Sequence, residues 1–269
     1  MRIGAKEFHT KEKTYVMGIL NVTPDSFSDG GKYQDMDAVL SHAEEMIGYG
    51  AAIIDVGGES TRPGYERILD EEEIGRVVPV IRAIKERFDV PISVDTYKSK
   101  VAKAAIEAGA DMINDIWGLK ADPDMAKVIA DSGVACCLMH NRSDMKYHNF
   151  LHDLLRDLRE SVDIALKAGI RDDKIILDPG VGFAKTYEQN LLAIKHMGRL
   201  KDIGYPILLG TSRKSVIGLT LDLPSDDRLE GTLATTVLGV REGVSFVRVH
   251  DVKENYRAIL MAEKILSAR

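Results

Sequence analysis

The sequence has few cysteines and no long apolar segment, and each shortage excludes a class of protein. Two cysteines among 269 residues cannot build a disulfide framework. Cys136 and Cys137 are adjacent in a predicted strand, so their side chains point to opposite faces and are expected to be small core residues. No uninterrupted apolar run could span a bilayer, and the first residues lack the basic and apolar regions of a secretory leader. The sequence therefore predicts a reduced, cytoplasmic protein with no membrane association.

An excess of positive charge is also missing. The chain has 36 Lys and Arg residues against 42 Asp and Glu residues, a formal net charge of −6. This balance argues against a surface that binds nucleic acid or an anionic membrane, so any anion site must be local. With 45% hydrophobic residues, the chain is long enough for one large core. We therefore expect a single domain over residues 1–269.

Short apolar runs alternate with helical patterns along the whole chain. The apolar runs predict strands at about 14–21, 52–57, 91–96, 112–116, 134–140, 174–179, 206–210 and 246–251. Helices are predicted near 36–49 and 70–87, then after the strand at 91–96 as far as about 108. Further helices are predicted near 122–132, 149–168, 187–200, 227–242 and 252–267. Long polar loops, about 22–31 and 58–66, follow the first two strands. Eight strand–helix pairs without a linker predict a (β/α)8 TIM barrel. A doubly wound open sheet is the main competitor, but it normally has fewer strands.

Polar side chains gather where the predicted strands end. The stretch 175–186 is typical: an apolar run ends at Asp178, which is followed by proline and glycines. The residues of this kind are Asn21, Asp95, Asn114, Asp178, Lys214, Arg248 and His250. The carboxyl ends of barrel strands meet at one mouth, so we expect these side chains to share a pocket. Asp95, Asn114 and Asp178 supply two carboxylates and an amide, which suit a flat heterocycle with N–H groups. Lys214, Arg248 and His250 form a cationic cluster that suits a phosphate. Each residue taken singly is also compatible with an ordinary barrel rim.

Two longer motifs carry a family resemblance. The stretches 18–31 (GILNVTPDSFSDGG) and 55–64 (DVGGESTRPG) resemble the signature motifs of the dihydropteroate synthase family of pterin-binding enzymes. Shorter blocks at 94–96, 113–115, 177–186, 210–215 and 248–251 match the family's remaining motifs in order. The resemblance spans nearly the whole chain. It implies a (β/α)8 barrel that condenses 6-hydroxymethyl-7,8-dihydropterin pyrophosphate with 4-aminobenzoate, giving 7,8-dihydropteroate and pyrophosphate.

The resemblance also implies roles for individual residues. The pterin would be bound by Asp95, Asn114, Met139, Asp178, Lys214 and Arg248. The aminobenzoate would be bound by Phe27, Thr61, Arg62, Pro63 and Ser215. The pyrophosphate would contact Asn21, Thr61, Arg248 and His250, and Asn21 would coordinate the cofactor Mg2+. Catalysis would depend on Asp95, Asp178, Lys214, Arg248 and His250.

We expect a dissociative, SN1-like reaction, because pyrophosphate leaves a CH2 group attached to an electron-rich ring. The loops 22–31 and 58–66 would exclude water, with Asp29 helping to anchor the first. The resemblance further implies a homodimer formed through the last helices. Two alternatives remain open: a pterin-dependent methyltransferase on the same barrel, and a catalytically silent pterin-binding paralogue. The histidines His140, His148 and His152 lack partners at metal-binding spacing and are expected at the surface or rim, and Trp117 is expected to pack at the rim.

Overall fold

A computed structural model describes residues 1–22, 32–59 and 67–268 of the chain. Eight parallel strands form one sheet in the order β8-β7-β6-β5-β4-β3-β10-β9. They are β3 (Tyr15–Asn21), β4 (Ala51–Gly57), β5 (Ile92–Asp95), β6 (Met112–Asp115), β7 (Ala135–Met139), β8 (Ile175–Asp178), β9 (Leu208–Leu209) and β10 (Phe246–Val249). A parallel bridge joins Leu177 of β8 to Ile207, the residue before β9, so the two outer strands of the sheet meet. The sheet therefore closes into the predicted (β/α)8 barrel.

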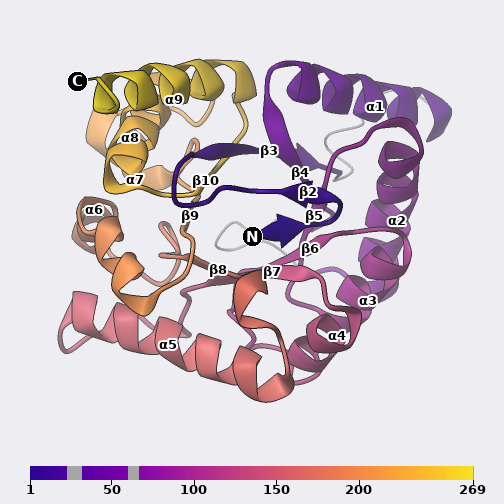
Figure 1. The fold of residues 1–269 in the computed structure, drawn as a ribbon, viewed down its shortest axis with the longest axis horizontal. Coiled ribbons are helices and arrows are strands. Elements are labelled where there is room, and N and C mark those ends of the chain that lie inside the picture. The colour runs from indigo at the N-terminus through magenta and orange to yellow at the C-terminus, as the bar shows by residue number, and fades with distance from the viewer. Residues whose placement is uncertain (23–31, 60–66, 269) are drawn as a thin grey trace.

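Helices surround the barrel as an outer ring, seen end-on in Figure 1. They are α1 (Lys32–Gly48), α2 (Asp70–Arg87), α3 (Ser99–Glu107), α4 (Met125–Ser132), α5 (Phe150–Ala168), α6 (Tyr187–Lys195), α7 (Ser215–Leu221), α8 (Leu229–Glu242) and α9 (Val252–Leu266), with short 3-10 turns η2 (Asp172–Lys174) and η3 (Met197–Ile203). The helix ends at Gly133 and Gly169 have positive φ angles of 70° and 97°, which suits glycine. Within the described residues, no helix is both long and apolar enough to cross a membrane.

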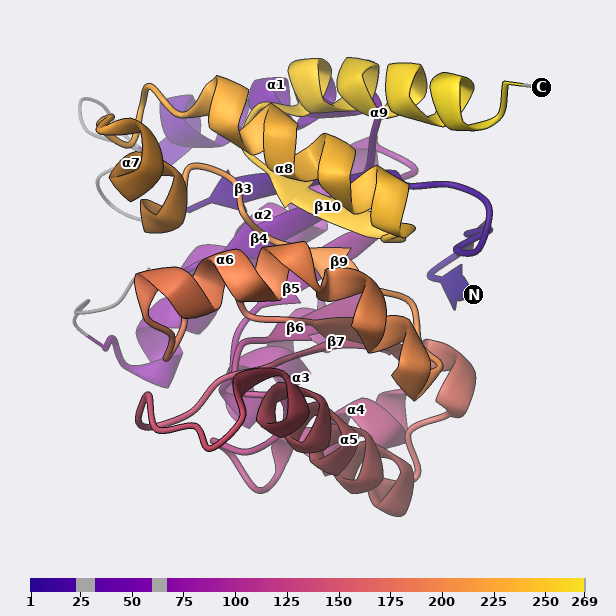
Figure 2. The ribbon, with the colours of Figure 1, turned by 90° about the vertical axis from the view of Figure 1, so that its left-hand side faces the viewer.

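Strand alternation divides the core into two layers. Outward side chains such as Val56, Val94 and Leu177 pack against the helices. Inward side chains near the amino ends of the strands, including Met17, Ile53 and Phe246, fill the barrel. A small hairpin, β1 (Arg2–Ile3) and β2 (Lys6–Glu7), covers this end, and Ile3 of the hairpin and Phe8, the residue after it, join the inner cluster. Figure 2 shows the hairpin on the right, so the opposite end of the barrel is the mouth.

Several element predictions need correction. The helix predicted near 187–200 ends at Lys195 and continues as η3, in which Gly198 lies close to the Glu242 carboxylate of α8. No helix was predicted between the strand at 206–210 and the helix at 227–242, but α7 lies there, and the N-terminal hairpin was not predicted either. The two hairpin strands have two residues each, too few for a visible alternation. Both cysteines are buried and free, as predicted.

Candidate active site

The first half of the mouth is built by four neighbouring strands. Parallel pairing aligns Asn21 with Gly57, Gly57 with Asp95, and Asp95 with Asn114. Gly57 has no side chain. A Cβ atom at Gly57 would stand 3.5 Å from Oδ1 of Asn21 and 3.8 Å from Cβ of Asp95, so these two side chains border the space above the glycine. Asp95 and Asn114 are buried, whereas Asn21 is exposed at the rim. These three predicted site residues thus lie together.

The second half of the mouth is formed by β7, β8 and the segment after β9. Met139 pairs with Asp178, and Asp178 lies opposite Lys214 across Gly210. A Cβ at Gly210 would stand 3.5 Å from Oδ2 of Asp178 and 3.7 Å from Nζ of Lys214. The other carboxylate oxygen of Asp178 accepts a hydrogen bond of 2.6 Å from the Gly180 amide. One face of the pocket thus combines an acid, a cation and an apolar thioether.

Arg248 lies between the two halves. Its Nε donates to Asp55 at 2.6 Å, and its Nη2 donates to Asp95 at 2.7 Å. Asp55 was not predicted as a site residue, although the sequence shows it before the end of β4. The sequence contains a usable signal, because side chains alternate between the two faces of a strand. Asp55 is two residues before Gly57 in β4, so it faces into the barrel as Gly57 does. Because Asp55 is completely buried, this pairing fixes the guanidinium.

The buried charges leave acceptors without partners. Among the described residues, Oδ1 of Asp55 and Oδ1 of Asp95 are buried and accept no hydrogen bond. Burial raises the pKa of Asp95 to about 7 although Arg248 opposes the shift, and burial likewise raises the pKa of Asp178 against the influence of Lys214. Such acceptors are costly unless a donor meets them, so the pocket favours a ligand with N–H groups.

The two cations respond differently to this environment. Burial lowers the pKa of Lys214 to about 8, although Asp178 opposes that shift. Burial also acts to lower the pKa of Arg248, but Asp55 and Asp95 together hold it above its usual value. Arg248 is therefore a permanent cation, whereas the charge of Lys214 is sensitive to pH.

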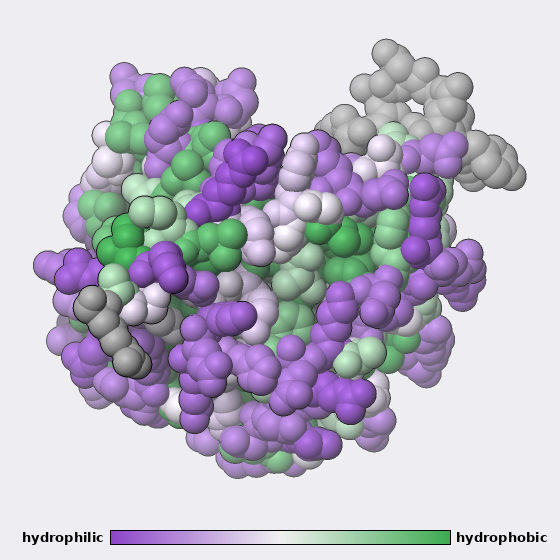
Figure 3. Space-filling model, turned by 45° about the horizontal axis from the view of Figure 1, so that its top comes forward, coloured by the Kyte–Doolittle hydropathy of each residue, from purple (hydrophilic) through white to green (hydrophobic). Residues whose placement is uncertain are grey.

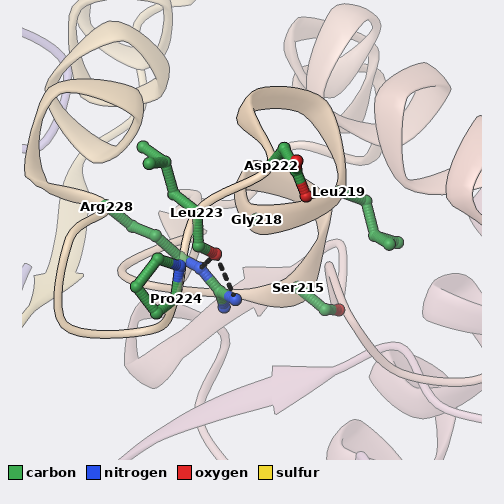
Figure 4. Close-up of a pocket in the computed structure, with 7 residues that line it drawn as sticks. All are labelled: Ser215, Gly218, Leu219, Asp222, Leu223, Pro224 and Arg228. Carbon is green, nitrogen blue, oxygen red and sulfur yellow. Dashed lines mark hydrogen bonds between the residues drawn. The ribbon is translucent and has the colours of Figure 1, made fainter.

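His250 and Ser215 border the mouth on the side of α7. The Nδ1 atom of His250 is 2.9 Å from the hydroxyl oxygen of Ser212, whose segment follows β9. Ser215 is exposed at the first position of α7 and lines a shallow pocket of about 410 Å³, shown in Figure 4. Arg228 also lines this pocket, but its guanidinium is engaged by the carbonyls of Leu223 and Arg213. The pocket is therefore an approach to Ser215 and not a separate anion site.

Some sequence predictions fall outside this picture. The predicted site residues Phe27, Thr61, Arg62 and Pro63, together with Asp29, lie outside the described residues. His148 and His152 are exposed as expected, whereas His140 lies at the rim but is buried there and is not a surface residue. His140 is 2% exposed, because it follows β7 directly and packs between Lys185 and Asp157. Trp117 packs at the rim, as predicted, in a small apolar cluster with Met139.

The described residues contain no group of three or more His, Cys, Asp or Glu side chains that could hold a metal ion. A protein-only cage of the kind that calcium or structural zinc uses is therefore not found in that part of the chain. Mg2+ often takes one or two protein oxygens and completes its shell with water and substrate phosphates. The exposed amide oxygen of Asn21, at the rim beside Asp95, fits that kind of site.

Comparisons with known proteins agree with this geometry. The family model described as "Pterin binding enzyme" matches residues 17–250. A dihydropteroate synthase of Clostridium beijerinckii is 63% identical over 99% of both chains. A dihydropteroate synthase structure from Clostridium difficile, determined in the presence of pteroic acid, matches with a TM-score of 0.94 and 50% identity over 97% of this chain and 100% of its own. The enzyme from Xanthomonas albilineans, solved with 4-aminobenzoic acid, matches with a TM-score of 0.91 and 39% identity over 96% and 95% of the two chains.

Both relatives of known structure are barrels of the same topology, and the matched region contains the strands whose ends form the mouth. Identity of 63% along nearly the full length far exceeds what a shared fold alone would require. The chain therefore belongs to the pterin-binding enzyme family and, within it, to the dihydropteroate synthases, which are transferases.

Proposed function

We propose that this chain condenses 6-hydroxymethyl-7,8-dihydropterin pyrophosphate with 4-aminobenzoate to form 7,8-dihydropteroate and pyrophosphate, as a step of folate biosynthesis. The observation that carries the proposal is the pairing, at one barrel mouth, of a buried unpartnered acceptor on Asp95 with the cations Arg248 and Lys214. The relatives support it, because one was determined in the presence of pteroic acid and another with 4-aminobenzoic acid.

The pterin would lie across the mouth with its pyrimidine edge toward the acids. Asp95 and Asp178 would accept from ring N–H and exocyclic amine groups, and Asn114 would complete that edge. Lys214 would donate to the carbonyl and N5 side. Met139 would pack against the ring, where an adaptable thioether suits a flat heterocycle. Arg248 would stack on the pterin face while remaining paired with Asp95, which explains why its planar guanidinium is held on two sides.

The diphosphate would lie at the rim near Asn21, His250 and Arg248, with Thr61 contributing from the second loop. Asn21 would hold Mg2+ there, and the ion would supply neutralisation of the departing phosphates. The side chain of His250, fixed through Ser212, would donate to a phosphate oxygen. The charge of this rim is therefore complementary to the leaving group.

The aminobenzoate would approach from the side of α7. Its carboxylate would be bound by Ser215, and Phe27, Thr61, Arg62 and Pro63 would close over its ring. The shallow pocket beside Ser215 provides room for entry (Figure 4). Lys214 lies 4.9 Å from the centre of the Phe183 ring, so the wall between the two substrates is both apolar and cationic.

The charges of the site suggest the order of bond changes. The C–O bond to pyrophosphate would break first, since the positive charge on the CH2 group spreads into the pterin and is stabilised by Asp95 and Asp178. The neutral arylamine would then attack the cation and lose a proton. An intermediate of this kind reacts with water, so the loops 22–31 and 58–66 would exclude it. Asp29 would help to anchor the first loop, which predicts lower turnover in Asp29→Ala.

We also propose a homodimer formed through the last helices. Apolar side chains on α8 and α9 are exposed, and Figure 3 shows apolar surface gathered on the left, where these helices lie. They include Val237, Leu238, Tyr256, Leu260, Met261, Ile265 and Leu266. A patch of this kind is typical of an interface. Sedimentation of Met261→Glu as a monomer, with wild type as a dimer, would support this proposal. The single domain over 1–269 and the cytoplasmic location stay predictions.

The proposed reaction is tested by following pyrophosphate release and dihydropteroate together. Purified protein is given pterin pyrophosphate and Mg2+, with and without 4-aminobenzoate. Release coupled to dihydropteroate formation supports the synthase. Pterin binding without product supports the silent paralogue, and methyl transfer from a methylated pterin supports the methyltransferase.

A further inference from the structure

The loop that joins β8 to α6 contributes to both proposed substrate pockets. It begins at Asp178, expected at the pterin edge, and contains Phe183, whose ring is covered by Lys214. Three residues of this short loop, Gly180, Gly182 and Ala184, have positive φ angles of 68°, 90° and 44°. Left-handed backbone at a residue with a side chain, such as Ala184, is unfavourable unless other contacts fix it. The loop therefore needs a source of order beyond its own turns.

Lys185 provides that order from inside the loop. Its side chain is buried, and its Nζ donates to the carbonyl of Gly180 at 2.8 Å and to that of Phe183 at 2.9 Å. A third contact, 2.9 Å long, joins Nζ to Nδ1 of His140. The His140 carbonyl oxygen is a fourth, longer contact at 3.5 Å, and the three shorter contacts match the three N–H groups of an ammonium. Because the two carbonyls belong to opposite ends of the turn, one side chain fixes its shape.

A second set of contacts fixes Lys185 itself. Burial lowers the pKa of His140 to about 4, so its ring is neutral, and Nδ1 accepts from Lys185 while Nε2–H donates to Asp157 at 3.3 Å. Arg142 donates to the same Asp157 carboxylate at 2.6 Å. The chain of contacts therefore runs from α5 through His140 to the loop.

The 180–183 turn contacts Asp178 and Lys214, two of the side chains expected to bind the pterin. Gly180 donates from its amide to the Asp178 carboxylate at 2.6 Å. A Cβ atom at Gly180 would stand 2.0 Å from the carbonyl oxygen of His140, the residue after β7. The turn therefore packs directly against the end of β7. The Val181 carbonyl accepts from Lys214. A displaced turn would therefore move the acid and the cation that line the pterin and the ring that borders the aminobenzoate.

We infer that Lys185 is a positioning residue that sets both substrate pockets at once, by holding the 180–183 turn through the Gly180 and Phe183 carbonyls. The inference rests on the proposed function, since it assigns no new reaction. It adds that the two pockets share one mechanical support that contacts neither substrate. A residue acting in this way changes the affinity for both substrates, whereas a residue that only stabilises the fold changes neither.

The test compares Lys185→Met with a matched control, Lys174→Met. Lys174 precedes the opposite end of β8 and donates to the Arg2 carbonyl at 2.7 Å, far from the mouth. For Lys185→Met we expect the KM values of both substrates to rise and kcat/KM to fall by about 100-fold, the scale of a 1 Å misplacement. For Lys174→Met we expect both KM values to equal those of wild type. Folded Lys185→Met with wild-type KM values and a lower Tm would overturn the inference.

A second variant decides the matter if Lys185→Met does not fold. Asp157→Asn weakens the outer end of the chain of contacts and keeps nearly the same side-chain volume at this buried position on α5. A rise of both KM values in the same direction, but smaller, supports the inference, and unchanged values overturn it. Wild-type protein is assayed in the same series. Absence of dihydropteroate from wild type would refute the proposed function, whereas normal wild-type turnover with unaffected variants refutes only the role of Lys185.

Discussion

Replacing Asp95 by asparagine probes the pocket at its most constrained point. One oxygen of Asp95 accepts from Arg248 at 2.7 Å, and the other is buried without a partner among the described residues. An asparagine has a single acceptor oxygen, so it can serve Arg248 or the pterin but not both. The NH2 group of the asparagine would then face an N–H donor, either that of Arg248 or that of the pterin. Asp95→Asn should therefore weaken pterin binding while preserving the shape of the site.

The size of the effect follows from the lost interactions. A hydrogen bond to a charged group contributes about 1.5–3 kcal/mol, which corresponds to a rise of roughly 10- to 150-fold in the Kd for pterin pyrophosphate. Loss of the negative charge beside the developing cation should lower kcat by a further factor of about 100 to 1,000. Calorimetric titration gives the first quantity, and dihydropteroate formation under saturating substrate gives the second.

Asp115→Asn is the matched control. Asp115 is also a buried aspartate at a strand end, but it faces outward and accepts from the amides of Trp117 and Leu119 at 2.8 Å and 2.7 Å. This variant should lose about 1–3 kcal/mol of unfolding free energy and keep the wild-type Kd. A wild-type Kd in Asp95→Asn, or equal weakening in both variants, would refute the assignment of Asp95 to the pterin edge.

Three further predictions concern pH, the second substrate and the loop glycine. Burial raises the pKa of Asp95 from 3.8 to about 7, so its carboxylate forms as the pH rises through about 7, and pterin affinity should rise with it. The contribution of Asp95 to folding stability is full at acidic pH and is lost as the pH rises through about 7. Asp95→Asn should abolish both trends, whereas the alkaline decline expected above about 8, where Lys214 loses its proton, should remain. Ser215→Ala should raise the KM for 4-aminobenzoate by roughly 3- to 10-fold and leave the pterin Kd unchanged, and equal effects on both substrates would contradict the division of the pocket. Gly180→Ala places a methyl group against the His140 carbonyl at a φ of 68°, so it should cost about 1–3 kcal/mol in chemical denaturation, whereas Gly75→Ala, in open space on α2, should gain about 0.5–1 kcal/mol.

The fold could be predicted because its signals are local. Each apolar run ends at a polar residue or a glycine, so all eight strands were found, and α2 was predicted with its observed bounds of Asp70–Arg87. The failures depend on distant contacts. The segment after Lys195, where α6 gives way to η3, approaches Glu242 of α8 at Gly198, and the hairpin at β1 and β2 packs under the barrel. Neither contact leaves a periodic pattern in the sequence.

The site was predictable as a set of strand-end residues but not as a network. Parity places Asp95, Asn114 and Asp178 inside the barrel, and the closure of the sheet brings them together. The pairing of Arg248 with Asp55 depends on which strands become neighbours across β3, which composition does not encode. The burial of Lys185 was also missed, because a lysine in a glycine-rich loop reads as an exposed residue unless the carbonyls that surround it are known.

The central claim is that the mouth of the barrel breaks the C–O bond to pyrophosphate before the amine attacks. The most direct test is the secondary deuterium isotope effect on kcat/KM for pterin pyrophosphate deuterated at the reacting CH2 group. Departure of pyrophosphate first converts this carbon to a planar cation, so the account predicts a clearly normal effect, with the deuterated substrate reacting more slowly. An effect indistinguishable from unity under conditions where chemistry limits the rate would show direct displacement by the amine and would contradict the account.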